Sequence, residues 1–143
     1  MTPEGIAKIK EHEGLRLVAY KCPTGHWTIG YGHTSDRHRE VVPGLKITQE
    51  EADRLLLLDL GEAEQDARRI VPDFNALSPH RQDALVNWAF QIGYGGMRTF
   101  TNTMNYIRTG RWEQAAQGLE KSLWFKQTQP SRTSYVISAI REG

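Results

Sequence analysis

The sequence lacks the features that mark a disulfide-rich, membrane-spanning or disordered protein. Its 143 residues include one cysteine, Cys22, so no intramolecular disulfide can form. No apolar run approaches the roughly 20 residues that span a bilayer, and the charged start MTPEGIAKIKEHEG does not resemble a secretory signal. Hydrophobic residues make up 38% and charged residues 24%, as in an ordinary globular domain. We therefore expect a single domain without stable membrane association, accumulating in the cytoplasm unless another factor releases it.

The charges nearly cancel, at a formal net charge of +1, but their distribution is uneven. Residues 50–66 contain seven acids and one base, whereas eight Lys and Arg follow residue 74 against four acids, a difference of +4. A basic half suits an anionic polymer such as cell wall or nucleic acid, although a solvated surface explains it as well. No helix carries a stripe of Lys and Arg, and Trp88, Phe90 and Trp124 have core-like spacing. Nucleic-acid binding is therefore disfavoured.

Several stretches have the apolar periodicity of amphipathic helices. The first begins with Thr2 as N-cap and Pro3 at the first helical position, and it ends at Gly14. The second begins with a capping box from Thr48 to Glu51. The predicted helices cover residues 2–14, 48–71, 78–93, 102–109, 112–122 and 130 onward.

Only residues 15–34 read as sheet, because apolar residues alternate over 15–19 and 27–31 around a Pro-Thr-Gly turn. One face of the second strand presents Thr28, Gly30 and Gly32, where a flat ligand can approach the backbone, or where glycines only serve a tight sheet. Residues 35–47 read as loop. The predicted fold is α+β and lysozyme-like: an antiparallel hairpin lobe (about 15–47), a long connecting helix, and a larger helical lobe (about 72–143 plus the first helix). We expect a ligand in a cleft between the lobes.

Glu13 is the candidate general acid. It lies four residues after Ile9 on the apolar face of the first helix, while Glu11 points away from that face. Partial desolvation favours the protonated form of a carboxyl group, which is the form that donates a proton in glycosidic cleavage. On this helix alone, a helix-terminal residue paired with an arginine is the favoured interpretation of Glu13.

The spacing of three residues then points to a family. Glu13, Cys22 and Thr28 match the pattern Glu, eight residues, Asp or Cys, five residues, Thr, and Gly-Tyr-Gly-His follows at 30–33. This resembles the signature of the phage lysozymes, glycoside hydrolase family 24. Segments 47–59, 90–93, 100–103, 111–116 and 124–128 resemble successive parts of the T-even phage lysozymes. Only the loop 35–46 is clearly different.

The resemblance implies an endolysin, a muramidase that hydrolyses the β-1,4 bond between N-acetylmuramic acid and N-acetylglucosamine of peptidoglycan. Glu13 would protonate the glycosidic oxygen, and Thr28 would hold the attacking water, with inversion. Cys22 would act as base, as nucleophile or as a spectator, and these three alternatives stay open. The resemblance also implies a structural ion pair between His33 and Asp59. The implied substrate contacts are Gly32, Thr34, Phe90, Gln91, Thr103 and Arg132, whereas Gly118 lacks a polar contact that relatives carry.

The implied partner is the peptidoglycan glycan strand, and the implied enzyme is a monomer without a cofactor. It would remain in the host cytoplasm until holin pores release it at lysis, and then act on the cell wall in the periplasm. The alternative is a catalytically weak peptidoglycan-binding module, which the presence of Glu13 disfavours. A metalloenzyme is disfavoured as well, because there is no HExxH and the five histidines scatter through loops and helix ends.

Overall fold

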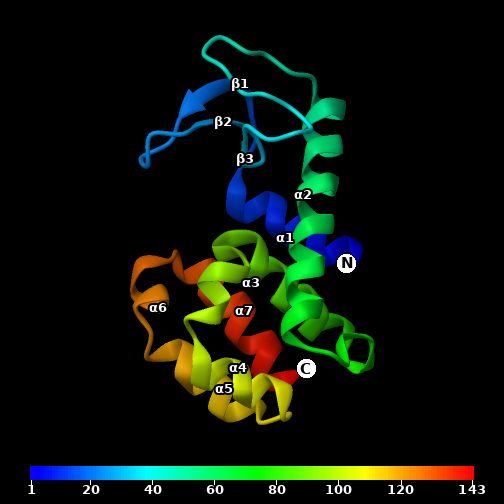
Figure 1. Cartoon of the computed structure of the whole chain (residues 1–143), viewed down its shortest axis with the longest axis vertical. Helices are drawn as coiled ribbons and strands as arrows, with labels where there is room; N and C mark the ends of the chain where they lie inside the picture. The colour runs from blue at the N-terminus through cyan, green and yellow to red at the C-terminus, as the bar shows by residue number, and fades with distance from the viewer. The chain divides into compact units, whose positions relative to one another are not determined.

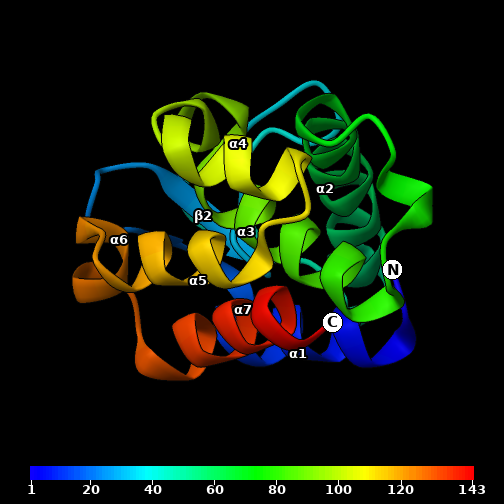
Figure 2. The same ribbon diagram turned by 90° about the horizontal axis from the view of Figure 1, so that it is seen from below.

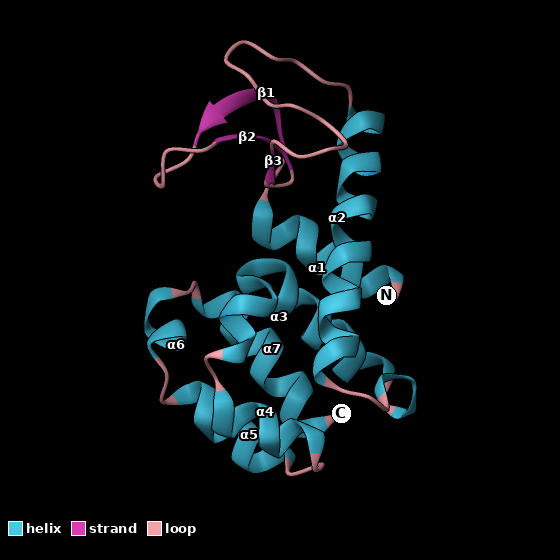
Figure 3. Cartoon of the chain, in the orientation of Figure 1, coloured by secondary structure: helices cyan, strands magenta, loops and turns pink.

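The computed structural model describes residues 1–143, and its α+β architecture confirms the predicted fold class. Strands are confined to residues 16–34, and the other regular elements are helices (Figure 3). The chain divides into two compact units. The sheet unit comprises Ala7–Gly61, and the helical unit comprises Met1–Ile6 with Glu62–Gly143. None of the helices combines the length and the apolar character that crossing a membrane requires.

The first two helices begin at the predicted N-caps. In α1 (Pro3–Glu13), the backbone N–H of Gly5 donates to the Thr2 hydroxyl at 3.0 Å. In α2 (Gln49–Ile70), the N–H of Glu51 donates to the Thr48 hydroxyl at 3.1 Å. These side chains satisfy N–H groups that the first turn of a helix leaves without a backbone partner. The sequence therefore predicted the first residue of both helices to within one residue.

The sheet is antiparallel in the order β1 (Arg16–Lys21), β2 (Trp27–Gly30) and β3 (His33–Thr34). Residues 45–47, expected as loop, instead pair with β1. The N–H of Ala19 donates to the Leu45 carbonyl at 2.8 Å, and that of Ile47 donates to the Leu17 carbonyl at 2.9 Å. This pairing covers the outer edge of β1, whose polar backbone groups would otherwise lack partners.

Residues Ile29, Val41 and Leu55 form the core of the sheet unit, so β2 packs against the first half of α2 (Figure 1). The expectation of an open face at Thr28 and Gly30 is wrong. Thr28 is only 4% exposed, and a Cβ at Gly30 would lie 3.5 Å from the Cβ of Ala52 in α2. Gly30 is thus buried beneath α2, and its φ of +65° favours glycine. Gly32 alone stays exposed on this stretch.

Helices make up the second unit: η1 (Phe74–Ala76), α3 (Pro79–Arg98), α4 (Thr101–Arg108), α5 (Trp112–Glu120), α6 (Leu123–Gln127) and α7 (Pro130–Glu142). Helices α4, α5 and α7 lie side by side (Figure 2). Trp88 is fully buried, with the rings of Phe100 and Trp124 at centroid distances of 5.1 and 6.3 Å. Both tryptophans belong to the core, as their spacing predicted.

Two parts of the helical unit differ from the sequence prediction. Helix α3 continues past its predicted end at Gly93, where φ +69° and ψ 171° kink the chain before a last stretch to Arg98. Only glycine adopts this backbone conformation readily. The short elements η1 and α6 were not predicted, since fewer than two helical turns show no apolar period.

Asp83 anchors the start of the chain within the helical unit. This carboxylate is 1% exposed and accepts hydrogen bonds from the backbone N–H (3.0 Å) and the hydroxyl of Thr2. A Cβ at Gly5 would lie 2.5 Å from the Asp83 carboxylate. The approach of α1 to Asp83 therefore requires glycine at position 5.

We predict opposite effects for two glycine-to-alanine changes in helices. Gly5→Ala should lower the free energy of unfolding by about 1–2 kcal/mol, because the methyl group displaces the Asp83 carboxylate. Gly61→Ala should raise it by up to about 1 kcal/mol, because a Cβ there meets nothing within 4 Å and alanine favours the helix. Urea denaturation measures both, and equal changes in the two variants would contradict this account of Gly5.

Candidate active site

Glu13 ends α1, and its carboxylate lies against the backbone at Gly32. A Cβ built on Gly32 would be 3.6 Å from Cδ and from both carboxylate oxygens of Glu13. Gly32 has φ +84°, a left-handed conformation that favours glycine. A residue with a side chain would be strained in this conformation, and its Cβ would be in ordinary van der Waals contact with the carboxylate. By contrast, Glu11 has a side chain 62% exposed, 3.3 Å from Nζ of Lys8.

Thr28 lies in the middle of the sheet, where it pairs with Tyr20 of β1 and with Thr34 of β3. Its hydroxyl donates to the carbonyl of His26 at 3.1 Å. Thr34 is exposed at the end of β3. The sheet therefore fixes the backbone of both threonines and brings them opposite each other.

Cys22 follows β1 directly, at the turn into β2. Its Sγ lies 2.9 Å from the Thr24 hydroxyl, and its backbone N–H donates to the His26 carbonyl at 2.9 Å. The hydrogen bond with Thr24 is the largest cause that lowers the pKa of the thiol to about 7; desolvation opposes it, and backbone groups and the Thr28 hydroxyl add to the lowering. A substantial fraction of Cys22 is therefore thiolate at neutral pH.

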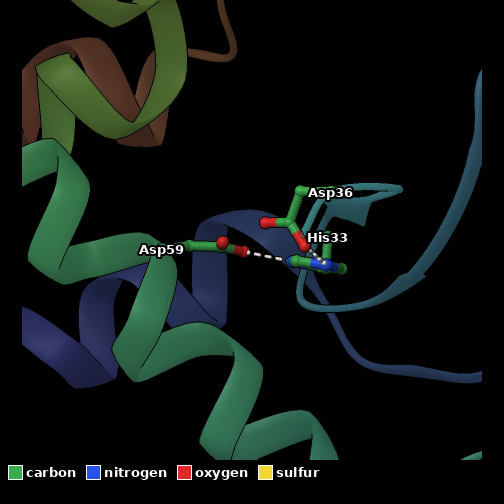
Figure 4. Close-up of side chains that lie close together, drawn as sticks. All are labelled: His33, Asp36 and Asp59. Carbon is green, nitrogen blue, oxygen red and sulfur yellow. Dashed lines mark hydrogen bonds and ion pairs between the residues drawn. The ribbon is translucent and has the colours of Figure 1, made fainter. Parts of the chain in front are cut away.

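His33 in β3 lies between two carboxylates (Figure 4). Its Nδ1 is 2.8 Å from Oδ2 of Asp59 in α2, and its Nε2 is 3.1 Å from Oδ1 of Asp36. Burial disfavours the charged ring, but the hydrogen bond and charge of Asp59 and the charge of Asp36 outweigh this and raise the pKa of His33. The structure therefore brings His33 and Asp59 together and adds Asp36, which sequence reasoning missed. The sequence feature that could have indicated this contact is the position of Asp36, three residues after His33.

In the helical unit, Gln91 joins two neighbouring side chains. Its Oε1 accepts from Nε1 of Trp124 at 2.8 Å, and its Nε2 donates to the Thr128 hydroxyl at 3.1 Å. Phe90 precedes it in α3 and is half-buried. Gln91 lines a hollow of about 580 Å³, together with Ile92, Thr99, Phe100, Ser122, Leu123, Trp124, Gln127 and Thr128.

A second, more polar hollow of about 310 Å³ contains Thr103 and Gly118. A Cβ at Gly118 would lie 2.7 Å from the Thr103 hydroxyl, so the glycine leaves room for that side chain. Thr103 is nevertheless only 5% exposed. Arg132, the remaining predicted contact residue, is 4% exposed, and its Nε donates to Oδ1 of Asn87 at 2.9 Å.

The family model described as phage lysozyme matches residues 10–134, which include Glu13, Cys22 and Thr28. The chain is 34% identical to the pre-baseplate central spike protein Gp5 of Enterobacteria phage T4, over 94% of this chain and 27% of that protein. It is 29% identical to probable T4-type lysozyme 1 of Dictyostelium discoideum, over 94% and 92% of the two chains. An endolysin of Acyrthosiphon pisum secondary endosymbiont phage 1 is 37% identical over 71% of this chain and 65% of its own length. The chain belongs to the phage lysozyme family.

Proposed function

We propose that this chain is an endolysin that hydrolyses the β-1,4 bond between N-acetylmuramic acid and N-acetylglucosamine of peptidoglycan, with Glu13 as general acid. The carboxylate of Glu13 against the bare backbone of Gly32 is the observation that carries the proposal. A sugar ring can approach the backbone closely at Gly32, because glycine has no side chain. Membership in the phage lysozyme family, which makes the chain a glycoside hydrolase, supports the same reaction.

In the proposed reaction the C1–O4 glycosidic bond breaks as Glu13 transfers its proton to O4. Glu13 is half-buried, whereas Glu11 is largely solvated and paired with a lysine. Partial burial favours the protonated carboxyl group that this step needs. The two glutamates on one helix therefore differ in their exposure to solvent.

Water supplies the second half of the reaction by attacking C1 from the opposite side of the ring, which gives inversion. We assign to the Thr28 hydroxyl the role of holding this water, and to the Cys22 thiolate the auxiliary role of accepting its proton. The hydrogen bond with Thr24 makes the thiolate available at neutral pH, with the pKa of the thiol near 7. General-base assistance is most effective when the pKa of the base is near the working pH.

The remaining substrate contacts of this proposal are the residues that the family resemblance implies, of which Gly32 and Thr34 are exposed, Gln91 and Thr103 line hollows, and Arg132 is buried. Gly32 and Thr34 belong to the sheet unit, and Phe90, Gln91, Thr103 and Arg132 to the helical unit. Gln91 and Thr103 line the two hollows and are, of the four residues in the helical unit, the best placed to contact substrate.

In this proposal the enzyme is a monomer made in the host cytoplasm, released through holin pores at lysis, and active on the cell wall in the periplasm.

We predict that Glu13→Gln folds normally but clears permeabilised cells at least ~100-fold more slowly than the wild type. The change keeps the size and hydrogen bonding of the side chain and removes the acid. The matched control is Glu11→Gln, two residues earlier on the same helix, which should keep wild-type clearing. Turbidity measures the rate, and the melting temperature reports folding. Wild-type clearing by Glu13→Gln would remove Glu13 from the mechanism, and a wild type that binds sacculi without releasing fragments would identify a binding module instead.

A second prediction concerns the pH profile of Cys22. If the thiolate accepts the proton, the acid limb of the wild-type rate should fall near pH 7, the pKa of the thiol. Cys22→Asp should stay active and move this limb to roughly pH 4, because a carboxylate ionises there. Cys22→Ser should lose activity, since a hydroxyl does not ionise in this range. Clearing rates from about pH 4 to 9 test this.

Two further variants separate the alternatives for Cys22. If it is a spectator, Cys22→Ala should match the wild type in rate and pH profile, while Thr28→Ala is strongly impaired. If the thiolate is a nucleophile, the Cys22→Ala enzyme should lose nearly all activity. An inactive but well-folded Cys22→Asp would contradict the auxiliary role proposed here.

A further inference from the structure

The loop after β3 contributes to a cluster of one histidine and two carboxylates in the sheet unit. His33, Asp36 and Asp59 each offer one ligand atom, and these atoms lie within 4.8 Å of one another. The His33 side chain is 2% exposed, while those of Asp36 and Asp59 are 29% and 19% exposed. The buried imidazole is thus reached from solvent through its two carboxylates, which come from different elements (Figure 4). The Glu13–Gly32 contact and the proposed chemistry do not use this group.

The two nitrogens of His33 have different environments. Nδ1 makes a hydrogen bond of 2.8 Å with Asp59. Nε2 is buried and makes no hydrogen bond, although it lies 3.1 Å from Oδ1 of Asp36, so the two atoms are close but misaligned. A histidine that binds a metal through one nitrogen usually donates its other N–H to a carboxylate. The contact between Asp59 and Nδ1 has that form, and it directs Nε2 toward Asp36.

The hydrogen bonds of Asp36 leave one of its oxygens available. Oδ1 accepts the backbone N–H groups of His38 at 2.9 Å and Arg39 at 3.0 Å. Oδ2 accepts no hydrogen bond from protein groups. The loop backbone therefore holds the carboxylate in place through one oxygen while the other keeps its lone pairs. A nitrogen of His38 also lies within 4.8 Å of an Asp36 oxygen.

The charges of the group favour a divalent cation. When His33 is protonated, its imidazolium and the two carboxylates together carry a net charge of −1. With a neutral imidazole and a divalent cation, the same residues sum to zero. Nε2 of His33 lies 3.1 Å from Oδ1 of Asp36, and because Oδ1 already accepts two backbone N–H groups, Oδ2 of the same carboxylate is the oxygen assigned to the ion. Mixed nitrogen and oxygen ligands suit zinc and its neighbours better than calcium or magnesium.

We propose that His33 and Asp36 bind a divalent transition-metal ion such as Zn²⁺, with Asp59 orienting the histidine through Nδ1. Water completes the coordination. The ion joins the 35–41 loop to β3 and, through Asp59, to α2. The site goes beyond the proposed hydrolysis and does not depend on it.

The test uses the full chain carrying Cys22→Ser, which removes the thiol as a competing zinc ligand. After treatment with EDTA and dialysis, ZnCl₂ is titrated by calorimetry, with MgCl₂ in parallel. We expect one Zn²⁺ per chain and a higher melting temperature, with no comparable effect of Mg²⁺. In ¹⁵N NMR spectra, Zn²⁺ should shift Nε2 of His33 and leave Nδ1 protonated.

Three carboxylate variants assign the site. Asp36→Asn should weaken Zn²⁺ binding at least ~10-fold, since it removes a charged ligand, and Asp59→Asn should weaken it by roughly 10–100-fold, as is typical for residues that orient a ligand. The matched control is Asp53→Asn, an exposed carboxylate of α2 that pairs with Lys10 at 3.3 Å, and it should bind as the parent does. The proposal is overturned if ~100 µM Zn²⁺ leaves the melting temperature and the His33 resonances unchanged, or if Asp36→Asn binds Zn²⁺ as tightly as the parent.

Discussion

The close approach of the Glu13 carboxylate to the backbone of Gly32 is the constraint on which the candidate site depends. It requires that the chain pass position 32 with φ +84°, a left-handed conformation that favours glycine and so leaves no side chain beside the carboxylate. It also requires that β3 be held firmly, although β3 has only two residues. Two pairs with β2 and the contact of His33 with Asp59 fix this short strand from both sides. The site thus rests on a strand too short to be stable alone.

Residues of the same type that lie close together in the sequence differ in their burial. Glu11 and Glu13 lie two positions apart on α1, yet one is solvated and the other lies half-buried against a glycine. Gly30 and Gly32 also lie two positions apart in the sheet unit, yet α2 packs on the first and the second stays exposed. The difference in exposure within each pair follows from what packs against the residue.

The turn from β1 to β2 lowers the pKa of the Cys22 thiol. An isolated thiol would be mostly neutral at pH 7. Here the Thr24 hydroxyl lies against Sγ and brings the pKa of the thiol to about 7. The local geometry of a four-residue turn therefore supplies ionisation that an aspartate would have intrinsically.

The sequence by itself determined the α+β fold class, the long helices, their caps at Thr2 and Thr48, and the family signature at Glu13, Cys22 and Thr28, because these depend on local spacing. Tertiary structure alone decided which glycine stays open, that residues 45–47 pair with β1, and that α3 continues through the kink at Gly93. It also placed Asp36 beside His33, and Thr103 and Arg132 in buried positions. These features depend on contacts between segments distant along the chain or on loop geometry, and apolar periodicity carries no information about either.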